Sequence, residues 1–480
     1  MSKLTGLLLY ISHSKAINRA GRFRKAVFLS ILFLAITGIL PVSAQFKFPK
    51  MPKMPAISNP FADNSKGTAD NAHVNEQPAP LTNNEKHELL AGQRQKWLPA
   101  HQQDNARLND NVTRLYFDKF GHLYPDPALS IDEFKFFYPF SRDISYTAHS
   151  SGNLEFYFTN DKYKLDELRK FYHVHAGLSP ARDFAVVQDS ILARYTRQIT
   201  SLCDTFEIAS LVFMIHGFNV ADPQPSFSKL RRSIKKYGYE NTAKPLYIEV
   251  HWDGLYAKNP LVLSSIWPQA LTNSKYVALG LRRFISRLNC HELPISIITH
   301  SLGAGVGTGA LFNTISKCDG ADVENNKALK RLMNLPPPDE PRIRLAMLAP
   351  AIPGGNTFID FNSRSPEISP AKNNIDRIII GYNPLDYATS KGYGKLMASR
   401  AGGTNLGCNN GYEQSYNDEI SNVKAALKKQ HYTDEQIDKL IISRRFTTPK
   451  AYGLYQQHRF IYYLDDEESM KVFLAGVFGE

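Results

Sequence analysis

Ser301 stands in the part of this 480-residue chain whose residue types are best suited to chemistry. The stretch reads "ISIITHSLGAGVGTGAL", an apolar run that ends at a His-Ser pair and continues through closely spaced glycines. A Ser on a sharp turn between a strand and a helix presents its hydroxyl as a nucleophile. Thr299 replaces the first Gly of the G-x-S-x-G pattern. The spacing predicts a nucleophilic Ser301, with Gly303 and Gly307 on one helix face that packs closely on the sheet.

The same stretch also fits a nucleotide-binding loop, because Gly305, Gly307 and Ala310 match G-x-G-x-x-A. A dinucleotide fingerprint needs its first Gly directly after a strand, and a carboxylate about 20 residues further on at the end of a second strand. Here Thr299 to Leu302 intervene, and Glu324 lies in a stretch without a strand pattern. We therefore favour the nucleophile.

A nucleophile that attacks a carbonyl needs two fixed N–H donors for the developing oxyanion. One normally comes from the residue after the nucleophile and the other from the loop after an earlier strand. Leu302 follows Ser301, and "VFMIHGFNV" supplies an earlier strand with a His-Gly-Phe-Asn turn. We expect the backbone N–H groups of Phe218 and Leu302 to be the donors, with Gly217 allowing close approach. An ordinary turn at the end of a strand is the alternative.

The same chemistry needs a carboxylate and a His that follow the nucleophile in that order. "DRIIIGYNPLDYA" ends a predicted strand and places Asp386 on the next loop, with Asp360 as the rival acid. Downstream of Asp386 lie His431 and His458. His431 comes just before Thr433, which begins a helix-capping pattern. A position at the solvated start of a helix accounts for His431 without a catalytic role. We predict Asp386 as the acid and His458 as the base.

Three aromatic residues are candidates for lining an apolar substrate pocket: Trp252, Tyr382 and Tyr387. The Trp lies in "VHWDGL" at the end of a predicted strand, and the two Tyr residues flank the candidate acid. Pockets of this kind are mostly apolar with a few fixed polar groups, although core packing explains each residue equally well. Segments 353–375 and 391–457 are candidates for a lid that selects the substrate.

These residues can meet only if the strands that carry them end on the same side of a sheet. Short apolar runs alternate with helical stretches from residue 205 onward; the expected strands are 210–215, 245–250, 294–299, 342–348 and 376–381, and the expected helices include 227–237 and 276–288. Uninterrupted apolar strands that alternate with helices are typical of a parallel sheet covered on both faces. We predict an α/β fold with its functional groups at the carboxyl ends of the strands.

Composition divides the chain before this region into three parts. Residues 1–44 combine a basic stretch, a 15-residue apolar run and "VSA", which predicts a secretory signal; an uncleaved membrane anchor is the alternative. Residues 45–84 are rich in Pro, Asn and Ser and predict a flexible linker. Residues 85–204 are globular in composition and are expected to form a small accessory α+β region. Residues 205–480 form the predicted main domain.

Three elements are expected within the accessory region. "RLYFDKFGHLYPD" predicts a hairpin with Gly121 near its bend, and "NLEFYFTND" predicts a short strand. Asp183 opens a stretch with apolar residues at helical spacing. That face is expected to pack on a neighbouring element.

Charge and cysteine content narrow the classes of function. The net charge is +12, but six positive charges and no acidic residue precede residue 45, which leaves +6 for the remainder. Without a dense basic stripe, the chain is not expected to bind nucleic acid. The four cysteines lack a metal-binding spacing, and the predicted chemistry needs no metal or organic cofactor.

The run of motifs resembles the α/β-hydrolase superfamily, and within it a little-characterised bacterial branch of predicted serine hydrolases. The resemblance spans about residues 208–465 and rests on "VFMIHGFNV", "IEVHWDGL", "ISIITHSLGAGVGTGAL", "RIRLAMLAPAIPGGNTF", "IIIGYNPLDYA" and "HRFIYYL". By position it implies that Ser301 is the nucleophile, Asp386 the acid and His458 the base. In that branch the residue two before the nucleophile is often not Gly, which accommodates Thr299.

These observations lead to the expectation of an exported serine hydrolase that cleaves an ester or related acyl bond in a small-molecule or lipid substrate. Lipase, carboxylesterase and peptidase activities stay open, with the aromatic surroundings favouring the first two. Association with a membrane surface and the oligomeric state also stay open. The alternative is a protein that keeps the fold as a binding partner or scaffold but has lost turnover.

Overall fold

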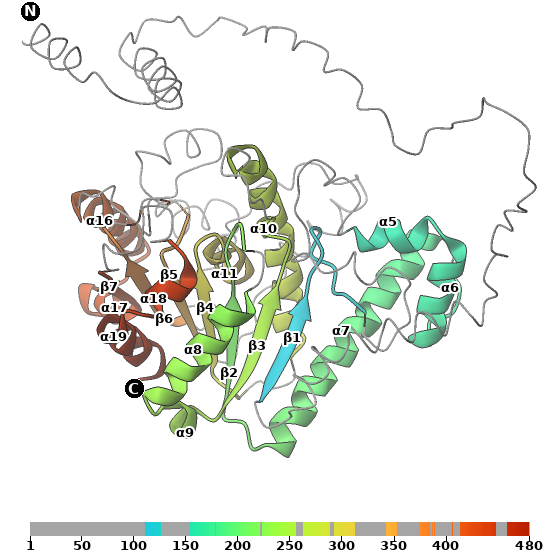
Figure 1. Ribbon diagram of the computed structural model, residues 1–480, viewed down its shortest axis with the longest axis horizontal. Helices are drawn as coiled ribbons and strands as arrows, with labels where there is room; N and C mark the ends of the chain where they lie inside the picture. The colour runs from blue at the N-terminus through green and yellow to red at the C-terminus, as the bar shows by residue number, and fades with distance from the viewer. Residues whose placement is uncertain are drawn as a thin grey trace, which may run out of the picture. The chain divides into compact units, whose positions relative to one another are not determined.

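Seven strands form one all-parallel sheet in the computed structural model, which confirms a parallel α/β architecture (Figure 1). The structure describes residues 111–125, 153–177, 179–220, 223–255, 263–288, 292–312, 342–352, 375–384, 386, 388, 406, 413–447 and 458–479. The strands are β1 (Val112–Tyr116), β2 (Ser210–Ile215), β3 (Pro245–His251), β4 (Ile295–His300), β5 (Ile343–Leu348), β6 (Ile375–Tyr382) and β7 (Ile441–Arg445). They lie in the order β1-β3-β2-β4-β5-β6-β7, and the five predicted strands are β2 to β6.

Helices connect and flank these strands. They are α5 (Leu154–Thr159), α6 (Lys162–Phe171), α7 (Pro180–Thr205), α8 (Gln224–Lys236), α9 (Tyr239–Ala243), α10 (Leu263–Ile285), α11 (Gly303–Leu311), α16 (Glu413–Lys429), α17 (Asp434–Leu440), α18 (Phe460–Tyr463) and α19 (Glu467–Phe478). The helices expected around 227–237 and 276–288 correspond to α8 and α10. The amphipathic stretch from Asp183 lies within α7, and its predicted apolar face is buried.

Alternate residues of each central strand enter different hydrophobic clusters on the two faces of the sheet, because successive side chains of a strand point to opposite faces. In β2, Phe213 joins the cluster that includes side chains of α7, α10 and α11, whereas Met214 joins the one that includes α8 and α19. Both side chains are fully buried. The continuous apolar runs read from the sequence therefore reflect a sheet covered on both sides.

The first strand and the helices that follow it differ from the sequence-based expectation. β1 pairs in parallel with β3 at the edge of the sheet, and an isolated antiparallel bridge joins Phe117 and Leu123 around the left-handed Gly121. "NLEFYFTND" contains helix α5 and was wrongly predicted as a strand. Its aromatic residues favour strands, but the Asn153 side chain caps the helix, and Leu154 and Phe158 bury one helical face. Side chains of β1, α5, α6 and α7 belong to the same hydrophobic cluster as the sheet.

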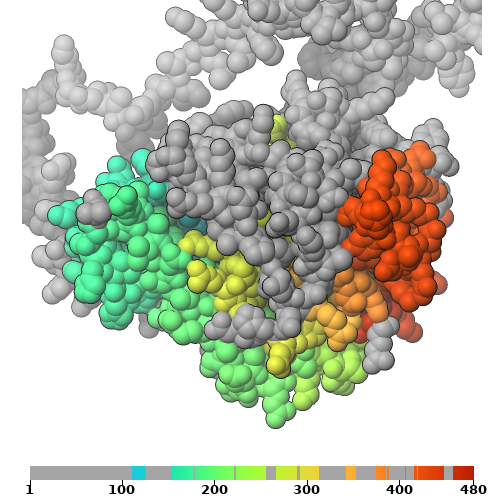
Figure 2. Space-filling view, turned by 180° about the vertical axis from the view of Figure 1, so that it is seen from behind, coloured from blue at the N-terminus to red at the C-terminus, as the bar shows by residue number. Residues whose placement is uncertain are grey.

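β7 is a strand that the sequence analysis missed, because Ile441-Ile442 is followed by Ser443 and two arginines instead of an apolar run. It lies inside the segment 391–457, so this portion of the proposed lid is an edge of the sheet with α16 and α17 beside it. Viewed from behind, α5 to α7 and α16 to α17 occupy opposite flanks, next to the two edge strands (Figure 2).

Several predictions fall on residues outside those described: the signal segment 1–44, the linker 45–84, segment 353–374 with the rival acid Asp360, and Tyr387. Among the helices that the structure does describe, none has the length and apolar character needed to cross a membrane.

The connections after β2 and β4 leave the sheet toward opposite faces. β2 leads to α8 on one face, and its neighbour β4 leads to α11 on the other. The loops at the carboxyl ends of these adjacent strands therefore diverge, and such a divergence is where open α/β sheets bind their ligands. Ser301 follows β4 and His216 follows β2, so both candidate motifs lie at this point.

Two glycines allow α11 to lie directly on the sheet, as their four-residue spacing predicted. A Cβ atom on Gly303 would come within 2.5 Å of the His216 carbonyl oxygen, and one on Gly307 within 3.0 Å of the Thr299 side chain. The glycine string is thus inside a buried helix, and this placement does not support the nucleotide-loop alternative.

We expect Gly303→Ala to lower the free energy of unfolding by about 1–3 kcal/mol, because the added methyl group meets fixed backbone. Gly305→Ala is the matched control in the same helix, where the nearest atom lies 3.5 Å away on a flexible Leu302 side chain. It should cause no loss, since Ala is favoured over Gly within helices by about 0.5–1 kcal/mol. Urea denaturation followed by circular dichroism measures both changes. Equal losses in the two variants would contradict the close packing at Gly303.

Candidate active site

Ser301 occupies a sharp turn between β4 and α11 with a left-handed backbone, φ 55°. This conformation is uncommon for a residue other than Gly and persists only where the surroundings hold it. Two backbone hydrogen bonds do so here: Ser301 N donates to the Leu348 carbonyl at 3.0 Å, and Ala351 N donates to the Ser301 carbonyl at 3.1 Å. The strand-turn-helix geometry predicted for Ser301 is confirmed.

Three predicted residues from separate parts of the chain meet at this turn. His458 Nε2 lies 2.7 Å from Ser301 Oγ, and His458 Nδ1 lies 2.7 Å from Asp386 Oδ2. The carboxylate can only accept, so Nδ1 carries a proton, and in the neutral imidazole Nε2 is then free to accept the Ser301 hydroxyl proton. The arrangement can carry a proton from the Ser301 hydroxyl to an imidazole oriented by a carboxylate.

Asp386 is fully buried, and burial alone would raise its pKa. The positive charge and hydrogen bond of His458, together with a hydrogen bond from Tyr463, outweigh burial and lower the pKa of Asp386 below its ordinary value. Tyr463 donates its hydroxyl proton to Asp386 Oδ2, the same oxygen that faces His458. Tyr463 was not among the predicted site residues, although its position little more than one helical turn after the candidate base was a usable signal.

The turn after β2 lies directly against the Ser301 side chain. A Cβ atom on Gly217 would come within 2.6 Å of Ser301 Cβ and 3.2 Å of Ser301 Oγ, so only Gly fits. Gly217 therefore allows the close approach predicted for it. This places the backbone of the His-Gly-Phe turn beside the candidate nucleophile.

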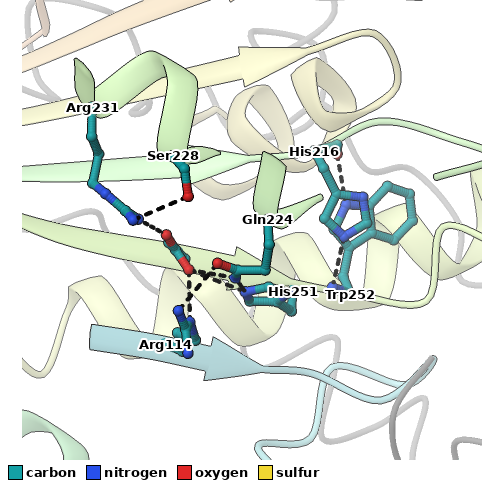
Figure 3. Close-up of polar contacts among 8 residues, drawn as sticks. Arg114, His216, Gln224, Ser228, Arg231, His251 and Trp252 are labelled. Atoms are coloured by element: carbon teal, nitrogen blue, oxygen red, sulfur yellow. Dashed lines mark hydrogen bonds and ion pairs between the residues drawn. The ribbon is translucent and has the colours of Figure 1, made fainter. Parts of the chain in front are cut away.

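His216 holds the conformation of this turn (Figure 3). Its Nε2 accepts the Trp252 amide proton at 3.2 Å, and its Nδ1 lies 2.9 Å from the Gly217 carbonyl oxygen. Burial and the nearby His251 lower the pKa of His216 to about 3, so the ring is neutral at neutral pH. The neutral tautomer must therefore carry its proton on Nδ1 and donate it to the Gly217 carbonyl.

That hydrogen bond also orients the peptide between Gly217 and Phe218. In a trans peptide the C=O and N–H bonds point in opposite directions, so the Phe218 N–H points away from His216. Within the described part of the chain, the backbone N–H groups of Phe218 and Leu302 donate to no acceptor. Both are thus available to a ligand, as the predicted oxyanion donors must be.

Trp252 is fully buried behind the His216 turn. Its Nε1 donates to the His216 carbonyl at 2.8 Å, and its ring stacks on the imidazole at a centroid distance of 5.7 Å. Tyr382 is buried as well and stacks on Tyr416, with ring centroids 3.8 Å apart. The contacts of Trp252 and Tyr382 are thus core-packing contacts, which the sequence left open as the alternative to lining a pocket. Substrate contact for these two residues and for Tyr387 stays a prediction.

A buried carboxylate on β3, the strand between β1 and β2, contacts Arg114, Gln224 and Arg231 beside this region (Figure 3). Glu249 is fully buried and accepts hydrogen bonds from Arg114 Nε at 2.8 Å, from Gln224 Nε2 at 2.6 Å and from Arg231. Gln224 Nε2 also lies 3.1 Å from His251 Nε2. The carboxylate thereby ties β1 and α8 to β3, next to the strand end that carries the His216 turn.

His431, the rival base, lies elsewhere. It is exposed, and Thr433 and Gln436 nearby form the capping box that the sequence predicted at the start of α17. Among the described residues, no three His, Cys, Asp or Glu side chains gather as metal ligands would.

Comparisons of the chain with protein-family models, with curated proteins and with solved structures find no match.

We expect Tyr463→Phe to lower the free energy of unfolding at pH 7 by about 1.5–3 kcal/mol, the range for a hydrogen bond to a charged group. Asp386 has a lowered pKa in the fold, so its charge contributes stability above its unfolded pKa of about 3.9, and this contribution is lost as the pH falls through the folded pKa. The variant raises the folded pKa of Asp386. The difference from wild type should therefore hold above about pH 4 and shrink below it.

Tyr416→Phe is the matched control, because the Tyr416 hydroxyl bonds to the uncharged Ser443 hydroxyl at 2.7 Å. Its cost should not change between pH 7 and pH 3. Urea denaturation at both pH values measures the two variants. A pH-independent loss for Tyr463→Phe would show that its hydroxyl does not act on the Asp386 charge.

Proposed function

We propose that this protein is a serine hydrolase that cleaves an ester or related acyl bond. The observation that carries the proposal is the continuous chain of contacts from Asp386 through His458 to Ser301, with both distances at 2.7 Å. A buried carboxylate, an imidazole and a hydroxyl in this order are the groups that activate a Ser for attack on a carbonyl.

The proposed reaction begins when Ser301 Oγ attacks the substrate carbonyl carbon. The hydroxyl proton passes to His458 Nε2, and Asp386 stabilises the imidazolium that forms. His458 then returns the proton to the leaving alkoxide as the ester C–O bond breaks, leaving an acyl group on Ser301. Water, deprotonated by His458, then attacks the acyl carbon; the bond to Ser301 Oγ breaks, His458 returns the proton to Oγ, and the carboxylic acid leaves. Every step balances without a metal or organic cofactor.

The backbone N–H groups of Phe218 and Leu302 would hold the oxyanion that forms in each tetrahedral intermediate. Supporting this role, Gly217 lies against Ser301, and the His216 hydrogen bond fixes the peptide that contains the Phe218 N–H. Fixed donors of this kind are worth about 2.7–4 kcal/mol each in catalysis. Because the pKa of His216 is lowered to about 3, its ring would stay neutral and the orientation of the Gly217–Phe218 peptide would not change between about pH 5 and pH 8.

Membership of the α/β-hydrolase superfamily is part of the proposal. It is supported by the parallel sheet, by the left-handed Ser between β4 and α11, and by the order of Ser, acid and His along the chain. Among the strands that the structure describes, the acid follows β6 and the His follows β7. We also propose, from the sequence of residues 1–44, that the protein is exported and acts on a small-molecule or lipid ester.

Ester hydrolysis tests the proposal directly. Purified protein comprising residues 45–480 should hydrolyse p-nitrophenyl esters of short or medium chain length. Ser301→Ala should lose turnover on the order of a millionfold, the scale seen when a triad nucleophile is removed. A Ser301→Ala variant that keeps most of the wild-type rate would rule out Ser301 as the nucleophile.

A fluorophosphonate probe separates an active hydrolase from a fold that has lost turnover. The probe reacts covalently with an activated Ser, so wild type should be labelled, whereas Ser301→Ala and His458→Ala should not. Gel fluorescence and mass spectrometry of the labelled peptide measure the result, with circular dichroism as the control for folding. Well-folded wild type that stays unlabelled would favour the scaffold alternative.

A further inference from the structure

His300 is a buried titratable residue beside the nucleophile that the proposed reaction does not use. It is the last residue of β4, and only 3% of it is exposed. Its ring stacks on Phe460 with centroids 4.9 Å apart and planes only 3° from parallel. The His458 ring lies 5.0 Å away, so His300 is packed between the nucleophile turn and the segment that carries the base.

The position of the His300 proton follows from its hydrogen bond. His300 Nε2 lies 2.8 Å from the backbone carbonyl oxygen of His458, and a carbonyl oxygen can only accept. Nε2 must therefore carry a proton. His300 Nδ1 is buried and meets no hydrogen-bond partner among the described residues, which is consistent with the unprotonated nitrogen of a neutral ring.

The surroundings keep this ring neutral. Burial is the largest influence and, together with the positive charge of His458, lowers the pKa of His300 well below its ordinary value. The charge of Asp386 and the hydrogen bond to His458 act in the opposite direction but are outweighed. His300 is thus a permanent hydrogen-bond donor that brings no charge of its own.

The backbone carbonyl of His458 needs such a donor because it lies before the first hydrogen bond of α18. In α18 the first carbonyl to accept a helical hydrogen bond is that of the N-cap, Arg459, which accepts from Tyr462 N at 3.0 Å. Among the described residues, the hydrogen bond to the His458 carbonyl comes from His300. The residue directly before the nucleophile therefore anchors the base, and one rigid strand end sets the distance between them.

We propose that His300 is a positioning residue that holds His458 at its distance from Ser301 and Asp386; this proposal rests on the proposed hydrolase function. A Lys or Arg side chain could also donate to the His458 carbonyl. Its charge would, however, disfavour the imidazolium that must form on His458 during the reaction. A neutral His supplies the hydrogen bond without this penalty.

Two amide variants in the full chain test the proposal. In His300→Gln the Nε2 donor is separated from Cα by as many bonds as His Nε2, so it can reach the His458 carbonyl. In His300→Asn the donor is one bond shorter and cannot. Both variants lose the aromatic stack on Phe460 equally, and the comparison therefore isolates the hydrogen bond. His300→Phe supplies the converse, because it keeps the stack and lacks the donor.

Initial rates with a p-nitrophenyl ester, fluorophosphonate labelling rates and thermal melting of each variant are the measurements. We expect kcat to fall about 10–100-fold in His300→Asn and His300→Phe, the scale of a misplacement of about 1 Å, with KM within about twofold of wild type. His300→Gln should recover most of kcat although it has lost the stack on Phe460, and His300→Phe should stay slow although it keeps that stack. A loss of activity caused only by weakened packing would instead follow the melting temperature.

Equal kcat in His300→Gln and His300→Asn, or full activity in His300→Phe, would overturn the positioning role while leaving labelled Ser301 as the nucleophile. A rise in KM at constant kcat would overturn it as well, since it would indicate a contact with substrate. Wild type that neither hydrolyses the ester nor reacts with the probe would overturn the proposed hydrolase function, and the role of His300 with it.

Discussion

The left-handed backbone at Ser301 is the constraint on which the rest of the site depends. A backbone φ of 55° is unfavourable for a residue with a side chain, so contacts with the surrounding strands must offset its cost in free energy. They do so through hydrogen bonds to Leu348 and Ala351, which require β5 to run beside β4 as far as its end. The Ser301 side chain then needs a neighbour without a Cβ atom, and Gly217 meets that need, while Gly303 lets the start of α11 pack against the end of β2. The conformation of one residue thus constrains the residue type in a segment that is distant in the sequence.

Much of the architecture could be predicted because it follows from local patterns. Apolar runs bounded by turns located β2 to β6, since each of these strands is buried on both faces. The contact of Ser301, Asp386 and His458 could be predicted by the same logic, because each lies just after a strand or before the last described helices and the chain order left few candidates. The capping box at Thr433 also removed His431 from consideration correctly, because capping depends on residues only three apart.

The features that were missed depend on contacts between distant segments. β1 and β7 are edge strands with mixed sequences, and they are strands mainly because β3 and β6 offer them hydrogen-bonding partners. α5 was wrongly predicted as a strand because its aromatic residues have high strand propensity. The helix forms because the Asn153 side chain caps its first turn and Leu154 is buried. The contacts of His300 and Tyr463 with the triad join residues brought together only by folding.

The buried Glu249 has a consequence for how the chain can be divided. Its carboxylate is compensated by Arg231 from α8 and by Arg114 from β1, a strand that precedes the predicted main domain by about 90 residues. A fragment starting at residue 205 would lose Arg114 and expose the whole hydrogen-bonding edge of β3, an apolar strand. Exposed apolar edges pair with other chains, so such a fragment would tend to aggregate. The sheet and the segment that carries β1 therefore depend on each other for a soluble fold.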